Sequence, residues 1–310
     1  MLVTGDWDEA GELATVTRAE GSPLERQMAV MVLAKLHRAR GNPETAWKLI
    51  GDILPRGPDS EPEDSLFPYA IETLRLATRL ALDTGDPEHA REWLQTHDRW
   101  LDWSNAIRGR ADSLVLWARI ARLEGRLADA ERIAWDAIAR AEDPRQPLAL
   151  CMAETELGSI TREQGRLDDA EPHLLKAYSL SARCAAPFYR LQVCLELAHL
   201  RIQQGRTDDG AELVQNAREI ADQLRADVYS EILDELSKVT ASTTAALTDL
   251  TAREIEVLRM VAEGLTDAEV ANALSISRRT VSQHLRSVYN KLGVSSRAAA
   301  TRYAVQHDLV

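Results

Sequence analysis

Apolar residues recur every three or four positions along most of this chain, and a glycine ends one such run about every forty residues. This spacing is typical of amphipathic helices, and glycine ends a helix readily because it adopts the left-handed backbone conformation. A short polar turn and a second apolar run follow each glycine. The pattern predicts helical hairpins around Gly5, Gly41, Gly85, Gly125, Gly165 and Gly205, at intervals of 36, 44, 40, 40 and 40 residues.

Small residues stand at fixed distances from these glycines. Seven positions before the glycine come Ala34, Thr78, Ala118, Gly158 and Ala198, and twelve after it come Ala137, Ala177 and Ala217. Small side chains let two helices approach closely where they cross. The predicted helix pairs are 24–40 with 43–54, 66–84 with 87–101, 110–124 with 127–142, 148–164 with 167–184 and 187–204 with 207–225, followed by a capping helix at 227–239.

One hairpin cannot bury its apolar face alone, so the repeats are expected to stack into a solenoid with a concave surface over residues 1–236. Aromatic residues are sparse, and no runs of alternating Val or Thr favour strands, so the predicted fold class is all-α. Two features break the period. Residues 55–62 hold three prolines and two acidic residues, which predicts a mobile surface loop. The first unit has no leading helix, so the chain either begins with a half-repeat or is the C-terminal part of a longer protein.

The last part of the chain follows a different pattern. Residues 237–249 lose the helical period and predict a linker. Two capping boxes follow, Thr251 with Glu254 and Thr266 with Glu269. In each box the hydroxyl and the carboxylate satisfy free amides of a first helical turn, so each box marks the start of a helix.

A third helix is predicted to begin after Ser277 and to run to about Lys291, and a fourth helix follows it. Residues 275–277 are the turn between the short second helix and the third. Two helices joined by so short a turn, the second rich in Arg, Ser, Thr and Gln, have the geometry with which proteins read the DNA major groove. Residues 250–310 therefore fit a DNA-binding domain, although the helix pattern and the charge alone would also fit any other four-helix fragment.

Charge is distributed unevenly along the chain. There are 37 Lys and Arg against 49 Asp and Glu, a net charge of −12. Residues 250–310 hold eight basic and six acidic side chains, a net charge of +2, so the rest of the chain carries −14. Residues 275–307 contain six basic residues and no acidic one. A polyanion would therefore be bound by the C-terminal domain and not by the acidic repeats.

Other chemistries leave no pattern. There is no HExxH, no GxSxG and no cluster of His and Cys ligands, so neither an enzyme nor a cofactor or metal site is expected. No apolar stretch approaches the roughly 20 residues of a membrane helix and no signal peptide opens the chain, so no membrane partner is expected and the predicted location is the cytoplasm. Cys151, Cys184 and Cys194 are predicted to be small buried residues, with a metal site or redox switch as the alternative. Trp93, Trp100 and Trp103 have helical spacing, which favours packing over a ligand-lining cluster.

The motifs of the C-terminal domain are similar to those of LuxR-type helix-turn-helix regulators. The matching segments are Leu250-Thr251-x-Arg253-Glu254-x-Glu256-Val257-Leu258, Glu269-Val270-Ala271, Leu274-x-Ile276-Ser277, Thr280-Val281-x-x-His284 and Lys291-Leu292-Gly293-Val294-x-Ser296-Arg297. The repeats resemble tetratricopeptide (TPR) repeats, and their period is closest to that in the sensor region of the large ATP-binding LuxR-family regulators. The resemblance implies a TPR-like solenoid followed by a four-helix LuxR-type domain. The ATPase of those regulators is not implied, because the sequence has no GxxxxGK[ST] phosphate loop.

The resemblance also implies roles for side chains of the third helix. Ser282, Gln283 and Arg286 match positions that face bases and nearby phosphates, so Arg286 would contact guanine and Gln283 adenine. Arg279 and Thr280 are placed for phosphates. A basic residue is frequent in the family where this chain has Ser282, which leaves the base preference there open. The implied DNA-binding residues are Arg278, Arg279, Thr280, Ser282, Gln283, Arg286, Asn290 and Lys291.

The family pairs its domains through the fourth helix, here through Ala298, Ala299, Tyr303 and Val305, which implies a homodimer on double-stranded DNA. The predicted function is a sequence-specific transcription regulator whose repeats sense a small-molecule or protein effector, with RNA polymerase as a further candidate partner. The alternative is a TPR-like protein-interaction scaffold with a vestigial DNA-binding domain. Salt-sensitive DNA binding distinguishes the two. The effector, the operator and the direction of regulation do not follow from the sequence.

Overall fold

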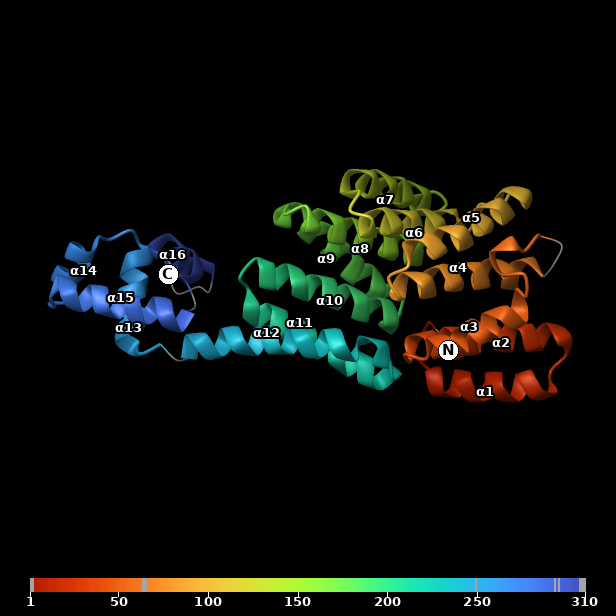
Figure 1. The fold of residues 1–310 in the computed structure, drawn as a ribbon, viewed down its shortest axis with the longest axis horizontal. Coiled ribbons are helices and arrows are strands. Elements are labelled where there is room, and N and C mark those ends of the chain that lie inside the picture. Colours follow the sequence, from red (N-terminus) through yellow and green to blue (C-terminus); the bar gives the residue numbers. More distant parts are fainter. Residues whose placement is uncertain (1–2, 63–65, 249, 293, 295, 307–310) are drawn as a thin grey trace. The chain divides into compact units, whose positions relative to one another are not determined.

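The computed structural model describes residues 3–62, 66–248, 250–292, 294 and 296–306. Every regular element within these ranges is a helix (Figure 1), which confirms the all-α class. The chain divides into two compact units, residues 1–197 with 216–231 and residues 198–215 with 232–310. The domain boundaries at 236 and 250 stay a prediction.

The hairpins lie where the glycine pattern places them. Helix α1 (Trp7–Glu20) follows Gly5. The next pairs are α2 (Pro23–Ala39) with α3 (Pro43–Ile53), α4 (Phe67–Asp83) with α5 (Pro87–Trp103), α6 (Arg110–Leu123) with α7 (Leu127–Glu142), α8 (Pro147–Glu163) with α9 (Leu167–Arg183) and α10 (Pro187–Gln203) with α11 (Thr207–Leu224). No end differs from its predicted position by more than two residues.

The glycines and small residues act as the pattern predicts. The backbone φ angle lies between +72° and +79° at Gly41, Gly85, Gly125, Gly165 and Gly205, the conformation that ends a helix. The small residues seven positions earlier are all buried. Gly158 shows why they must be small, because a Cβ there would come within 2.6 Å of the Leu174 side chain on α9. The close helix crossings are confirmed.

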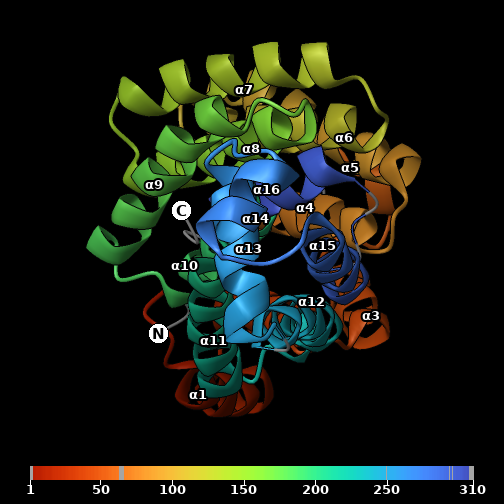
Figure 2. The same ribbon diagram turned by 90° about the vertical axis from the view of Figure 1, so that its left-hand side faces the viewer.

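Within the first compact unit the helices follow one another along an arc that brings α1 back beside the start of α10 (Figures 1 and 2). The indole of Trp7 on α1 packs on Phe188 of α10, with ring centres 5.3 Å apart. The Asp8 carboxylate pairs with the guanidinium of Arg225, just after α11, at 3.2 Å. We call this junction, made by Trp7, Asp8, Phe188 and Arg225, the seam. It joins the first helix of the array to the last hairpin.

Ion pairs link successive leading helices of the repeats. A basic side chain of one leading helix meets an acidic side chain of the next about one repeat later in the sequence. The pairs are Lys35–Glu72 at 2.7 Å, Arg38–Asp83 at 2.6 Å, Arg75–Asp112 at 3.0 Å, Arg122–Glu156 at 2.6 Å and Arg162–Glu196 at 3.1 Å. The solenoid is therefore held by a row of charges in addition to its apolar core.

The insert at residues 55–62 differs from the predicted mobile surface loop. It contains a 3-10 turn, η1 (Gly57–Asp59), and α5 anchors it. The indole N–H of Trp100 donates to the carbonyl of Ser60 at 3.1 Å, and Ser60 is fully buried. The prolines correctly predicted an irregular backbone in the insert. They could not predict that a tryptophan side chain of α5 would hold the insert in place. Trp93 and Trp100 are buried, as packing requires, whereas Trp103 is exposed.

The predicted linker is helical over most of its length. After a 3-10 turn, η2 (Asp227–Tyr229), helix α12 (Ser230–Thr248) continues through the segment that was expected to be irregular. The prediction of an irregular segment at 237–248 is therefore wrong, and residue 249 lies outside the described residues. The segment 237–248 contains neither glycine nor proline, the two residues that most strongly disfavour a helix, so its composition is compatible with the observed helix.

The C-terminal domain consists of α13 (Ala252–Ala262), α14 (Asp267–Ala273), α15 (Arg278–Leu292) and α16 (Arg297–Gln306). Two apolar clusters form its core, and both consist of residues from 250 onwards. One gathers Val257, Val261, Val270, Ala271, Val281 and Leu285, and the other gathers Leu250, Leu258, Val288, Leu292, Ala300 and Ala304. The domain therefore has a core of its own. Gly293, predicted to end the third helix, lies outside the described residues.

Within the part of the chain that the structure describes, no helix is both long and apolar enough to cross a membrane. Cys151 and Cys194 are buried, as predicted, and Cys184 is half-buried. Burial raises the pKa of the Cys151 thiol to about 12 and that of Cys194 to about 11. Both thiols are therefore protonated and unreactive at neutral pH.

Candidate nucleic-acid interface

The turn between α14 and α15 is held by hydrogen bonds from three sides. The amide of Ile276 donates to the carbonyl of Ala271 at 3.0 Å, which closes the end of α14. The guanidinium of Arg253 on α13 donates to the carbonyl of Leu274 at 2.8 Å. The hydroxyl of Ser277 accepts from the amide of Thr280 at 3.1 Å and so caps α15, as predicted. These hydrogen bonds hold α14 and α15 at a defined angle to each other.

Helix α15 has one buried and one open face. Val281, Leu285, Val288 and Leu292 are buried, at spacings of four, three and four residues. The side chains on the opposite face are exposed: Arg279, Ser282, Gln283, Arg286 and Asn290. Every one of them can donate a hydrogen bond to a phosphate or a base edge.

The arginines of this face keep their hydrogen-bonding capacity for a ligand. Among the described residues, Arg278, Arg279 and Arg286 form no ion pair, although acidic side chains elsewhere in the domain are paired. Arg278 and Arg279 lie in the first turn of α15, whose free amides favour anions. Thr280 is half-buried and its hydroxyl contacts that of Ser277 at 2.8 Å. The structure thus brings seven of the eight predicted DNA-binding residues to one side of α15 or to its start.

Lys291, the eighth, is bound within the domain. Its ammonium group contacts the carboxylate of Glu254 on α13 at 2.7 Å. Burial opposes ionisation of Glu254, but hydrogen bonds from Lys291, Ser287 and Thr251 outweigh that effect and lower the pKa of this carboxyl to about 2. Lys291 therefore connects α15 to the capping box of α13. Its ammonium group is engaged in this contact, unlike the arginines of the open face.

Asp267, the first residue of α14, organises the opposite edge of the domain. Its carboxylate accepts from Arg297 on α16 at 2.6 Å and from the hydroxyl of Ser282 at 3.3 Å. Arg297 belongs to the last of the matching motifs, but no sequence pattern indicated its contact with Asp267, because Asp267 also fits a place in the first turn of a helix. Ser282 therefore has a neighbouring carboxylate, which a DNA phosphate would have to replace.

The predicted pairing residues of α16 have different environments. Ala298 and Val305 are exposed and Ala299 is half-buried. Tyr303 packs partly against the apolar cluster of its own domain. Ala300 and Ala304 form the fully buried face of the helix. The open part of α16 available to a partner is therefore centred on Ala298 and Val305.

Comparison with known families agrees with both parts of this architecture. Residues 59–255 match the MalT-like TPR region, which covers more than half of the chain, and residues 248–304 match the bacterial regulatory proteins of the luxR family. The chain belongs to the MalT-like TPR family. Its C-terminal domain is a LuxR-type helix-turn-helix, and this combination is that of the large LuxR-family regulators. LuxR-type domains are the DNA-binding domains of transcription regulators.

Individual proteins resemble the LuxR-type domain or the fold of the chain. The response regulator protein VraR of Staphylococcus aureus (strain Mu3 / ATCC 700698) is 33% identical over 101 residues, which are 31% of this chain and 48% of VraR. VraR of strain NCTC 8325 / PS 47 gives the same values. The chain thus spans about half the length of the curated relatives it matches. A Rap protein complexed with Competence and Sporulation Factor aligns with a TM-score of 0.59 and 13% identity, over 97% of this chain and 83% of that one, which shows the fold alone.

Proposed function

We propose that this chain is a sequence-specific DNA-binding transcription regulator that reads bases with α15, pairs through α16 and senses an effector with its helical repeats. The observation that carries the proposal is the open face of α15. Arg279, Gln283 and Arg286 are exposed on the side of α15 that lies opposite its buried face. The turn before this helix is held by hydrogen bonds from α13, from α14 and from the cap of α15 itself.

Residues in the middle of α15 would contact bases, and residues at its start would contact phosphates. Arg286 and Gln283 lie in the middle of the helix, where a side chain reaches a base edge in the major groove. Arg278, Arg279 and Thr280 lie at the helix start, where contacts go to phosphates and set the register without reading sequence. Asn290 would extend the contact along the groove, and Ser282 would reach a neighbouring phosphate or base.

Pairing would be through the exposed part of α16. Ala298 and Val305 leave that helix with a small apolar surface toward solvent. A second copy placed against this surface would bring two α15 helices to successive half-sites of a palindromic operator. Lys291 is expected to act inside the domain, because its contact with Glu254 keeps it from the groove.

The repeats are the candidate sensing region. Solenoids of helical hairpins use their long inner surface to bind other molecules. The Rap protein of the same fold is described as a complex with Competence and Sporulation Factor, so a chain with this fold binds a partner molecule. Communication with RNA polymerase would follow DNA binding and belongs to the same proposal.

The test uses the full chain and a random pool of duplex DNA. Repeated selection is expected to enrich a sequence with two related half-sites, and binding to it should weaken steeply as salt is raised. Arg279→Ala combined with Arg286→Ala is expected to abolish the enrichment. Arg259→Ala, an exposed arginine on α13 away from the open face, serves as the control and should leave it intact. If no sequence is enriched and the double variant behaves like the wild type, the chain is a protein-interaction scaffold instead.

A further inference from the structure

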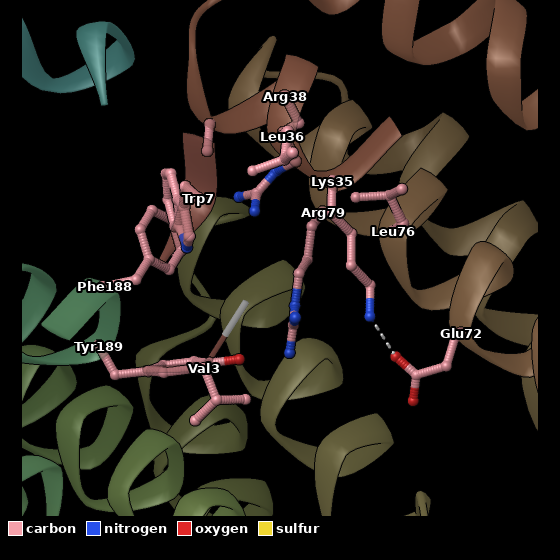
Figure 3. A pocket seen from close by; sticks show the side chains of 11 residues that line it. Val3, Trp7, Lys35, Leu36, Arg38, Glu72, Leu76, Arg79, Phe188 and Tyr189 are labelled. Carbon is pink, nitrogen blue, oxygen red and sulfur yellow. Dashed lines mark hydrogen bonds and ion pairs between the residues drawn. The ribbon is translucent and has the colours of Figure 1, made fainter. Parts of the chain in front are cut away.

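A cavity of about 110 Å³ lies at the seam of the repeat array (Figure 3). Its walls come from helices that are far apart in the sequence: α1 and α10 meet on one side, and α2 and α4 complete the lining. Trp7, Lys35, Glu72, Arg79, Phe188 and Tyr189 are among the side chains that line it. A cavity of this size can hold a small organic molecule. It exists only because the first helix of the array meets the last hairpin.

The lining carries more positive than negative charge. It includes Lys35, Arg38 and Arg79 but a single acidic residue, Glu72. Arg38 is already satisfied, because its guanidinium makes two hydrogen bonds to Asp83, at 2.6 and 3.0 Å. Glu72 accepts from Lys35 at 2.7 Å and also pairs with Arg75, which stands three residues later on the same helix. One carboxylate is thus shared between two cations, and Arg79 has none.

Arg79 is the exception in the row of ion pairs that links the leading helices. Its hydrogen-bond partner is the thioether sulfur of Met152 at 3.3 Å, a weak acceptor, and no carboxylate among the described residues pairs with it. Figure 3 shows its guanidinium pointing into the cavity, toward the hydroxyl end of Tyr189. Other partly buried arginines of the array, including Arg38, Arg122 and Arg162, pair with carboxylates, so the guanidinium of Arg79 has free hydrogen-bonding capacity for an anion.

The titration of Lys35 reflects the excess of positive charge around the cavity. Burial, followed by repulsion from Arg75 and Arg79, lowers the pKa of the Lys35 ammonium to about 8, although Tyr189 and Asp112 oppose the shift. Burial and Arg79 likewise lower the pKa of Arg75, against the opposite effect of Asp112. Negative charge placed near Arg79 would offset this repulsion and raise the pKa of both Lys35 and Arg75.

The rest of the cavity is apolar. Leu36 and Leu76 form part of the lining, and the rings of Trp7 and Phe188 stand on one side of it (Figure 3). Such a wall suits the hydrocarbon or aromatic body of a ligand, while a bare inorganic ion would leave it unused.

We propose that the seam cavity binds a small organic anion, with a carboxylate or phosphate group on Arg79 and Lys35 and an apolar body against Trp7 and Phe188. The proposal rests on the sensing role proposed for the repeats and gives that role a chemical class of effector. A bound anion would contact α1, α2, α4 and α10 together, so it would strengthen the closure of the array. The ligand would thereby favour the closed state because it binds that state better.

Binding to the full chain can be measured by calorimetry with three probes of similar size. Benzoate and phenyl phosphate are the anions, and benzamide is the neutral counterpart of benzoate. At least one anion is expected to bind and to raise the melting temperature of the repeats, whereas benzamide should bind at least about tenfold more weakly. Benzoate and phenyl phosphate together distinguish a carboxylate site from a phosphate site.

Arg79→Gln and Lys35→Gln are each expected to weaken anion binding at least about tenfold. Arg79→Gln should fold normally, since it removes a contact to sulfur only, and Lys35→Gln provides a second, independent variant. Arg132→Gln, an exposed arginine on α7, is the matched control and should bind the anion like the wild type.

The proposal is overturned if the wild type binds neither anion, if benzamide binds as well as benzoate, or if both variants keep their affinity. DNA binding of the two variants without anion should equal that of the wild type. A chain that binds operator DNA but no anion therefore contradicts the cavity alone. A chain that binds the anion but no DNA contradicts the proposed DNA-reading function alone.

Discussion

Arg286 and Arg279 share the open face of α15, but they stand two turns apart along it. Arg286→Ala is expected to cost about 1–3 kcal/mol of binding free energy and to relax the preference at one base position. Arg279→Ala should weaken binding to all sequences by a similar factor, because a phosphate contact carries no sequence information. Affinities for the selected operator and its single-base variants measure both effects. Unchanged specificity in Arg286→Ala would show that this side chain does not read a base.

Ala185 occupies a backbone conformation that glycine adopts more easily. Its φ angle is +48°, in the turn between α9 and α10, and the residue is exposed. Ala185→Gly is expected to raise the free energy of unfolding by up to about 1 kcal/mol, since the left-handed region disfavours a Cβ. Ala139→Gly, at an exposed position inside α7, is the matched control and should lower it by roughly 0.5–1 kcal/mol. Chemical denaturation of both variants checks the opposite signs.

The turns that follow the second helix of a hairpin were invisible in the glycine pattern. Asn105, Ala185 and Arg225 all have φ angles near +50° and stand at a 40- or 80-residue spacing. The sequence marks the first turn of each hairpin because glycine is used there throughout. In the second turn several residue types tolerate the same conformation at a modest energetic cost, so no single letter identifies it.

Helices α13 and α15 are joined by the contact between Glu254 and Lys291. The pKa of Glu254 is about 2 in the folded chain against its ordinary value of 4.5. The carboxylate therefore contributes stability that is fully present above pH 4.5 and is lost as the pH falls toward 2. Glu254→Gln should destabilise the LuxR-type domain by about 2 kcal/mol at neutral pH and flatten this acid dependence.

Thermal unfolding of the LuxR-type domain between pH 2 and pH 7 tests this expectation. Glu256→Gln is the control, because Glu256 is half-exposed and its ion-pair partner among the described residues is Arg253 of the same helix. It should change stability by a few tenths of a kcal/mol at most. Equal behaviour of the two variants would show that the tie between α13 and α15 is not stabilising.

Helix α14 packs against α15 and α13 through Ala271, which is buried beside Val257, Val281 and Leu285. Ala271→Leu is expected to overpack this crossing and to cost about 1–3 kcal/mol. In calorimetry the transition of the LuxR-type domain should move to lower temperature while that of the repeats stays in place. Ala273→Leu places the same side chain at an exposed position of α14 and should have little effect. Equal melting of the two variants would contradict the observed crossing.

Element boundaries were predictable where a capping residue or a glycine marks them. The capping boxes at Thr251 and Thr266 gave the starts of α13 and α14 to the residue. The segment 237–248 lacks a hydrophobic period and also lacks any residue that ends a helix, so periodicity alone misjudged it. Whether such a segment stays helical depends on propensity and on its neighbours, which the period does not report.

At the scale of the whole repeat array, the sequence pattern predicts which hairpins pack side by side, but it does not predict that the first helix meets the last hairpin. The period predicts that each hairpin packs on the next one, and it does. The meeting of Trp7 with Phe188 depends on a small rotation added at every repeat, which no local pattern encodes. The seam cavity follows from that meeting, so Arg79 and the other side chains that line it were absent from the predicted site residues. The open face of α15, in contrast, depends only on one helix and its cap.

The two parts of the chain carry opposite charge, +2 for residues 250–310 and −14 for the rest, out of a total of −12. DNA phosphates would be attracted by the open face of α15 and repelled by the acidic repeats, and at 0.1 M salt this repulsion is screened beyond about 10 Å. At about 50 mM salt we expect the full chain to bind the selected operator more weakly than residues 247–310, whose core is self-contained.

Raising the salt to about 200 mM should narrow this gap, because both chains lose counterion-driven affinity while only the full chain also loses a repulsion. The plot of log affinity against log salt is therefore expected to be less steep for the full chain. Affinities are compared at protein concentrations where both chains occupy the operator as dimers, and Arg286→Ala in both chains controls for non-specific binding. Parallel plots with equal affinities would mean that the repeats leave DNA binding unaffected, and any effect of a bound effector would then have to act through recruitment of other proteins.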